Sequence, residues 1–260
     1  MAELPWFMPA SYGRLSAVTD VQQIMDRLTV ILLAKGWTES PAGTFRTPND
    51  AAGRWYKLAF VRASATRLQC TMTDDIARAS IQREMQIVSG HTVDFHYSSR
   101  YLYIVNQNAV DFLWVNMLTL WPESDTVHDK YCVFHGGRDN TGAATTQHTL
   151  VMQTINASNV YVDVSDALRR PVVSYLSAGA MPLSRHISGR RRWWPAEQVG
   201  ADTAGQRIRG RLYNALVMSS AEASIGSEYN TVPVGGGATG IFRIVNIPIS
   251  QETVLAVRKV

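Results

Sequence analysis

The chain has 260 residues, 46% of them hydrophobic, which is enough to bury a sizeable core in one large β domain or in two smaller ones. Its two cysteines, Cys70 and Cys132, lie inside strand-like runs, and this excludes a disulfide scaffold. The net charge of only +4 excludes a protein that is basic over a whole face. No window approaches about 18 apolar residues and the N-terminus lacks a signal-peptide pattern, so we expect a protein made and used without secretion or membrane insertion.

One helix is predicted over residues 20–35. Apolar residues recur there at intervals of three and four, polar residues at positions 19 and 20 can cap the first amides, and a glycine follows the last turn. We expect the face formed by Ile24, Leu28 and Ile31 to pack against the first β sheet, because it would otherwise expose a large apolar stripe.

Strands are predicted next at residues 44–46, 54–61 and 66–72, where β-branched and aromatic residues dominate between turn signals. These strands could form a meander with the helix across it. Residues 74–85 are then predicted to form a short helix that begins at an acidic cap.

Residues 92–97 and 100–105 alternate as a hairpin pair joined by two serines. The run at residues 110–120 is apolar almost throughout and stops at a Trp-Pro pair, so it is buried, as either strand or helix. Residues 150–164 read as two more strands. Residues 177–202 are predicted to be a long irregular segment, and loops of that length usually bind something.

Three consecutive glycines, Gly235 to Gly237, join an apolar tract to a strand-like run at residues 241–249, and a closing strand is predicted at residues 252–258. A hairpin turn explains the glycines better than a phosphate-binding loop, because a strand follows them and no Lys-Ser/Thr pair does. The predicted fold class is α+β and predominantly β. An N-terminal α+β region at residues 1–125, with a helix on an antiparallel sheet, precedes a β-rich, sandwich-like region at residues 126–260.

The second region carries an arginine-rich loop at residues 177–205. Between residues 185 and 211 there are seven arginines against two carboxylates. Guanidinium groups beside indoles can bind phosphate and stack on bases, but Arg and Trp are also enriched at protein interfaces. We favour a subunit interface over contact with DNA or a solvated loop. The candidate interface residues are Arg185, Arg190, Arg191, Arg192, Trp193 and Trp194.

The nearest approach to a metal or catalytic cluster is formed by His128, Asp129, His135 and His148. Their spacing matches no zinc pattern, so we predict that they hold no metal and that the chain needs no cofactor. Cys132 lies in a strand-like run and not at a helix start, which disfavours a thiol nucleophile. We therefore predict a non-enzymatic protein without a small-molecule substrate. A hydrolase that uses His128 and Asp129 is the enzyme alternative.

Three stretches together resemble a group of tailed-bacteriophage virion structural proteins. The first is a strand leading into an apolar stretch that breaks at a proline before a Tyr/Gly-Gly segment, the second is Arg-Arg-Arg-Trp-Trp-Pro, and the third is a strand leading through a glycine turn to a closing strand. In this chain they are residues 100–108 with 110–124 and 131–137, residues 190–195, and residues 210–217, 225–228, 234–237, 241–248 and 255–258.

This resemblance covers roughly residues 20–260 in order, and the triple arginine departs from it. It implies a non-enzymatic component of the virion tail, head–tail neck or baseplate, assembled in the host cytoplasm in several copies around a symmetry axis. Its partners would be other virion proteins and copies of itself. The alternative is a baseplate-associated module that binds a host surface or carbohydrate, for which seven tryptophans and ten tyrosines could provide stacking platforms. An open groove lined by Trp114, Trp121, Trp193 and Trp194 would favour it.

Overall fold

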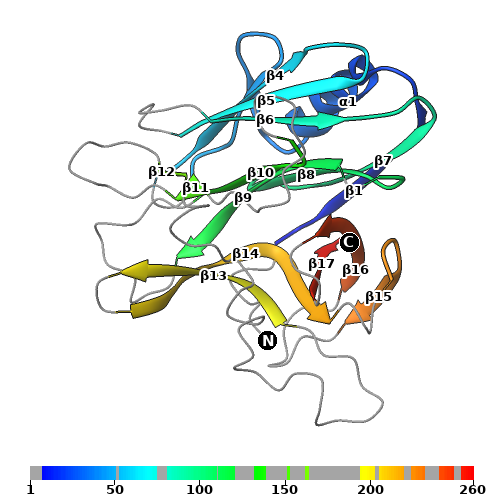
Figure 1. The fold of residues 1–260 in the computed structure, drawn as a ribbon. Helices are drawn as coiled ribbons and strands as arrows, with labels where there is room; N and C mark the ends of the chain where they lie inside the picture. The colour runs from blue at the N-terminus through cyan, green and yellow to red at the C-terminus, as the bar shows by residue number, and fades with distance from the viewer. Residues whose placement is uncertain are drawn as a thin grey trace.

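A computed structural model of the chain describes residues 8–50, 53–74, 81–109, 111–120, 132–138, 151–152, 162–163, 194–202, 205–219, 224–231, 240–248 and 253–260. Within these residues the chain is mostly β, with antiparallel sheets and one α-helix (Figure 1). The elements are β1 (Ser11–Val18), α1 (Val21–Leu33), β2 (Thr38–Glu39), β3 (Thr44–Arg46), β4 (Tyr56–Arg62), β5 (Arg67–Asp74), β6 (Ile81–Gln86), β7 (His91–Tyr97), β8 (Tyr101–Asn106), β9 (Asp111–Leu120), β10 (Cys132–Gly136), β11 (Val151–Met152), β12 (Val162–Asp163), β13 (Trp194–Asp202), β14 (Gly205–Ser219), β15 (Glu228–Thr231), β16 (Gly240–Pro248) and β17 (Thr253–Arg258).

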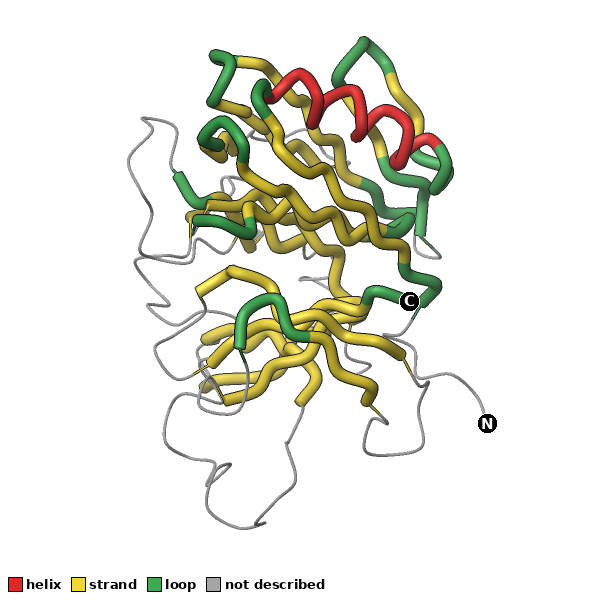
Figure 2. The backbone as a smooth tube through the Cα atoms, turned by 90° about the vertical axis from the view of Figure 1, so that its right-hand side faces the viewer, coloured by secondary structure: helices red, strands yellow, loops and turns green. Residues whose placement is uncertain are grey.

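Helix α1 lies against a five-stranded sheet with the order β2-β3-β4-β5-β6 (Figure 2). Asp20 caps the helix in a capping box with Gln23, which satisfies the first free amides. The predicted face is confirmed, since Ile24, Leu28 and Ile31 are all buried. No helix in the described part of the chain has the length and apolar character needed to cross a membrane.

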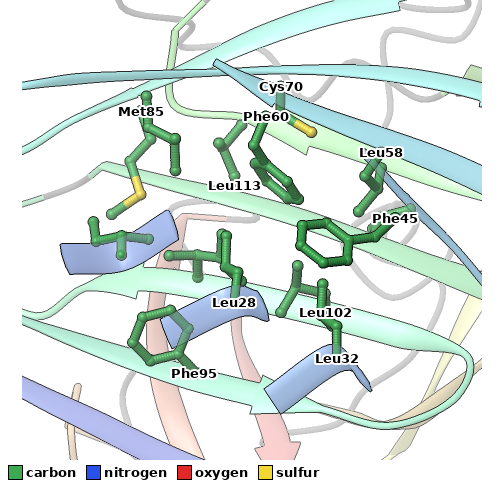
Figure 3. Packing of buried hydrophobic residues seen from close by; sticks show 14 of the residues in the cluster. Leu28, Leu32, Phe45, Leu58, Phe60, Cys70, Met85, Phe95, Leu102 and Leu113 are labelled. Atoms are coloured by element: carbon green, nitrogen blue, oxygen red, sulfur yellow. The ribbon is translucent and has the colours of Figure 1, made fainter. Parts of the chain in front are cut away.

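The core beneath α1 is shared by the helix, the small sheet and the central strands β7, β8 and β9. Figure 3 shows Leu28 of α1 and Phe95 of β7 in one cluster with residues of the small sheet. Cys70 on β5 belongs to this cluster as a buried free thiol, and burial raises its pKa well above the ordinary value. It thus packs as a small hydrophobic residue, as the sequence predicted.

Strands β8 and β9 are buried on both faces. Leu102 and Ile104 of β8 join the core beneath α1, whereas Tyr101, Tyr103 and Val105 point to the opposite side and are also fully buried. That second side is covered by the C-terminal strands, because β16 contacts both β8 and β9. Residues 111–117 are all buried, which explains why this stretch reads as apolar almost throughout. The strand-or-helix alternative is resolved in favour of strand β9.

The large sheet runs in the order β1-β7-β8-β9-β14-β17-β16-β15, with β10 beside β9 and β13 beside β14. Its C-terminal strands fold back over the central ones, so the described elements form three layers (Figure 1). The small sheet with α1 is the first layer, β1, β7, β8 and β9 are the central layer, and β14 to β17 are the C-terminal layer. Strand β9 lies before the predicted boundary at residue 125 and β14 lies after it, and the two strands are hydrogen-bonded to each other. The division of the chain into two regions at that boundary stays a prediction.

The backbones of β6 and β10 approach each other closely. Strand β6 belongs to the first layer, and β10 pairs with β9 of the central layer, so this contact joins the two layers. A Cβ atom added at Gly136 would lie 2.6 Å from the Cβ of Arg83 and 3.1 Å from the carbonyl oxygen of Glu84. Only glycine fits that position without a shift. The next residues complete the junction, because Arg138 exchanges backbone hydrogen bonds with Glu84 and pairs with Asp111 at 3.0 Å.

Most of the predicted strands are confirmed, including the hairpin β7–β8, strands β3, β4 and β5, the run that forms β16 and the closing strand β17. The two strands predicted within residues 150–164 appear as the short pair β11 and β12. The glycine turn at residues 235–237 lies outside the described residues, although the strands on either side of it, β15 and β16, do pair antiparallel.

Two predictions are wrong. The helix predicted at residues 74–85 is contradicted by strand β6, in which Arg83 lies opposite Cys70 of β5 and Met85 lies opposite Leu68. Antiparallel pairing with β5 therefore prevails over the acidic helix cap that the sequence offered. Residues 194–202, predicted to be irregular, form strand β13 in a hairpin with the long strand β14, which supplies partners for their backbone groups.

Candidate functional site

The predicted interface residues are only marginally covered by the structure. Arg185, Arg190, Arg191, Arg192 and Trp193 lie outside the described residues, and Trp194 is placed at the start of β13, opposite Val217 of β14.

Of the four candidate metal ligands, only His135 is placed, on β10 opposite Trp114. His128, Asp129 and His148 lie outside the described residues. Among the residues that are described, no three His, Cys, Asp or Glu side chains converge in a way that could hold a metal ion. The absence of a metal at the four predicted positions stays a prediction.

Ionisable side chains do gather where the central layer meets the C-terminal layer. Two register pairs of β1 and β7, Tyr12 with His96 and Arg14 with Asp94, place four polar residues on one face of the sheet. The C-terminal layer adds further charges from β15, β16 and the residue after β17. We call this group the interlayer cluster, and its members are Tyr12, Arg14, Asp94, His96, Glu228, Arg243 and Lys259.

Asp94 is the centre of the interlayer cluster, and its side chain is fully buried. Its Oδ1 accepts hydrogen bonds from the Tyr12 hydroxyl at 2.8 Å and from Arg14 Nε at 2.6 Å. Its Oδ2 accepts from Arg14 Nη2 at 3.0 Å and from Arg243 Nε at 2.9 Å. Burial by itself raises the pKa of Asp94, but the hydrogen bonds from Arg14 and Tyr12 and the charge of Arg243 outweigh it and hold the pKa below its ordinary value.

Two partly exposed residues of the interlayer cluster, Glu228 and Lys259, continue the network of ion pairs towards the surface. Glu228 accepts a hydrogen bond from Arg243 Nη1 at 2.9 Å and pairs with Lys259 Nζ at 3.0 Å. Lys259 also lies over the Tyr12 ring, 4.7 Å from its centroid. Burial raises the pKa of Tyr12 to about 12, with the hydrogen bond to Asp94 as the second cause, so the phenol stays protonated at neutral pH.

His96, like Tyr12, is an uncharged member of the interlayer cluster. Its Nδ1 lies 3.4 Å from the carbonyl oxygen of Arg258, which can only accept, so Nδ1 carries the proton. Its Nε2 is buried and has no hydrogen-bond partner among the described residues. Burial lowers the pKa of His96 to about 4, although the negative charge of Asp94 acts in the opposite direction. The imidazole is therefore uncharged at neutral pH and packs edge-on to Tyr12.

Acidification should lower the free energy of unfolding through His96 by about 2–3 kcal/mol between pH 7 and pH 4. The unfolded chain binds a proton near pH 6.5, whereas the folded chain does so only at about pH 4, so stability falls across that window. Asp94 affects stability at a lower pH than His96 does. The stabilisation by its ionised carboxylate is present above the pKa of the unfolded chain and is lost as the pH falls through the depressed pKa of the folded chain. Urea unfolding of wild type and His96→Gln at several pH values measures the difference. Parallel pH profiles would contradict the assignment.

A second polar group, the asparagine pair, lies between the central and C-terminal layers. Asn214 of β14 donates to the Tyr101 hydroxyl at 2.9 Å and to the carbonyl oxygen of Met8 at 2.8 Å, and it accepts from the Met8 amide at 3.0 Å. Asn116 of β9 donates to the Tyr103 hydroxyl at 2.8 Å and exchanges hydrogen bonds with the backbone of residue 213. Both asparagines are fully buried. They satisfy the tyrosine hydroxyls and hold the N-terminal segment against β14.

The hydrogen bonds and ion pairs of these two groups hold the central and C-terminal layers together. Both carboxylate oxygens of Asp94 already accept two hydrogen bonds each, and the two arginines that could bind an anion are paired with it. Trp114 is also committed to the interior, since it is buried and stacks on Tyr103 with ring centroids 5.3 Å apart. This removes Trp114 from the open aromatic groove that a carbohydrate-binding module would use.

No known family model matches the chain, and no curated protein matches it significantly in sequence.

Proposed function

We propose that the chain is a non-enzymatic structural component of a tailed-phage virion, built into the tail or the head–tail neck through protein–protein interfaces. In this proposal the β-rich, sandwich-like region of the fold is residues 126–260. The partners are other virion proteins and copies of the same chain, and the interface includes Arg185, Arg190 to Arg192, Trp193 and Trp194.

Two observations support the proposal. The three sequence stretches that resemble virion structural proteins include β8, β9 and the C-terminal layer, which are the strands that form the buried frame. The observation that carries it furthest is the interlayer cluster, where the buried carboxylate of Asp94, held by Arg14 within the central layer, pairs with Arg243 of the C-terminal layer. A frame that is held internally in this way suits a part that must keep its shape while neighbours pack around it.

The interface residues provide the test. Replacing Arg191, Arg192 and Trp193 by alanine should leave the chain folded but block its incorporation into particles, because truncation of Arg and Trp at interface hot spots costs about 2 kcal/mol or more each. The measurement is the occupancy of the protein in purified particles, with circular dichroism of the isolated variant as the check on folding.

The matched control removes two cations elsewhere, Lys35→Ala with Arg62→Ala, and should be incorporated normally. Full occupancy of the triple variant would count against the interface. Particles that assemble without any copy of the chain would count against a structural role altogether.

A further inference from the structure

The outer face of the small sheet places two cations directly opposite one another. Arg46 of β3 and Lys57 of β4 are register partners. Their neighbours Phe45 and Tyr56 are fully buried beneath α1, so the two cations point to the other side of the sheet. Trp55, just before β4, lies on that same outer side, and all three side chains are partly exposed.

These three side chains form a cation–aromatic group. The guanidinium carbon of Arg46 lies 4.6 Å from the centroid of the Trp55 ring, and Lys57 Nζ lies 5.8 Å from it. Arg46 also donates a hydrogen bond to Asn49 Oδ1 at 2.5 Å. The Trp55 ring and the Asn49 amide are both uncharged, so they leave the two positive charges facing each other.

Two other arginines of the small sheet are paired with acids. Arg62 pairs with Asp20 at 2.7 Å, and Arg67 pairs with the buried Glu84. Neither Arg46 nor Lys57 makes an ion pair with any described residue. Like charges directly opposite each other destabilise a sheet, whereas pairs of opposite charge stabilise it.

We propose that Arg46, Trp55 and Lys57 form a docking surface for an acidic segment of another protein. A carboxylate placed between Arg46 and Lys57 would relieve their repulsion and gain charge-assisted hydrogen bonds from both. Trp55 supplies an apolar, half-buried surface beside the charges, and Trp and Arg are the residues that most often anchor protein interfaces. The surface does not depend on the virion role.

A protein partner fits this surface better than a nucleic acid. Arg46 lies over the Trp55 ring, so a base could not stack on that face of the indole. Two cations also neutralise few phosphates, whereas nucleic-acid sites usually rely on a longer basic stripe.

The test is Lys57→Glu in the full chain, with two measurements. The thermal midpoint of the isolated protein should rise, because the substitution supplies the missing anion opposite Arg46. Affinity for a fluorescein-labelled peptide of alternating Glu and Ser, measured by anisotropy at low salt, should fall by about tenfold or more. Lys35→Glu is the matched control, since Lys35 lies 5.9 Å from the Tyr97 ring centroid and the change in net charge is the same.

The proposal is overturned if Lys57→Glu lowers the thermal midpoint, because an acid of the same chain would then already pair with Lys57. Equal peptide affinities of the Lys57→Glu and Lys35→Glu variants would overturn it as well, since binding would then follow net charge alone. A single-stranded oligonucleotide that binds more tightly than the peptide and is lost in Lys57→Glu would replace the protein partner with a nucleic acid. None of these readouts involves particle assembly, so they are independent of the proposed virion role.

Discussion

Replacing Asp94 by asparagine should lower the free energy of unfolding by about 3 kcal/mol, near the lower end of what breaking a buried ion pair costs. The amide keeps the size of the side chain but presents an NH2 group to donors. Arg14 is 41% exposed and can turn towards water, whereas Arg243 is only 11% exposed and would keep only its ion pair with the more exposed Glu228. Urea unfolding followed by circular dichroism measures the loss.

The matched control is Asp20→Asn, which breaks the exposed ion pair with Arg62 but keeps a good helix cap, because asparagine caps as well as aspartate does. Its effect should be much smaller, since exposed ion pairs contribute little. Equal losses in Asp94→Asn and Asp20→Asn would show that burial of the interlayer cluster adds nothing to stability.

Replacing Asn214 by alanine should cost about 3–4 kcal/mol, because two consequences add. The substitution leaves the backbone of Met8 and the Tyr101 hydroxyl without the hydrogen bonds that Asn214 provides in the interior. It also places alanine at a backbone φ of 54°, in the left-handed region that asparagine tolerates better.

Asn214→Gly separates the two consequences, because glycine adopts that φ freely but makes no hydrogen bonds. The glycine variant should recover about 1 kcal/mol of the loss in the alanine variant. If the alanine variant were as stable as wild type in urea unfolding, the hydrogen bonds from Asn214 would contribute nothing, and another contact would have to hold the N-terminal segment.

The elements that the sequence predicted best are those set by local patterns. Helix α1 follows from the spacing of its buried face and from the cap at Asp20, and the hairpin β7–β8 follows from alternation around two serines. Strand β6 was missed because one short strand with acidic residues before it resembles a helix start until its partner β5 is known. Strand β13 was missed because it contains Pro195 and Gly200, which are typical of loops, and because its pairing with β14 is visible only in the structure.

The interlayer cluster could not be predicted, since its partners are far apart in the sequence. Tyr12 and Arg243 lie 82 and 149 positions away from Asp94. Asp94 and His96 alternate with Val93, Phe95 and Tyr97, a pattern typical of a strand with one face in water. These residues are buried because the C-terminal layer covers that polar face of the strand. The pairing of Tyr12 and Arg14 with polar residues on the neighbouring strand is likewise visible only in the structure.

The long sequence separation between Asp94 and Arg243 also affects how the chain is synthesised. At about 5–20 residues per second, a ribosome needs on the order of ten seconds to add the residues between them. During that interval β7 and β8 can pair and α1 can form, but one face of the central strands has no cover. Nascent chains therefore expose Tyr101 and Tyr103 until the last strands emerge, and this is the stage at which a chaperone or a second nascent chain would meet an apolar surface.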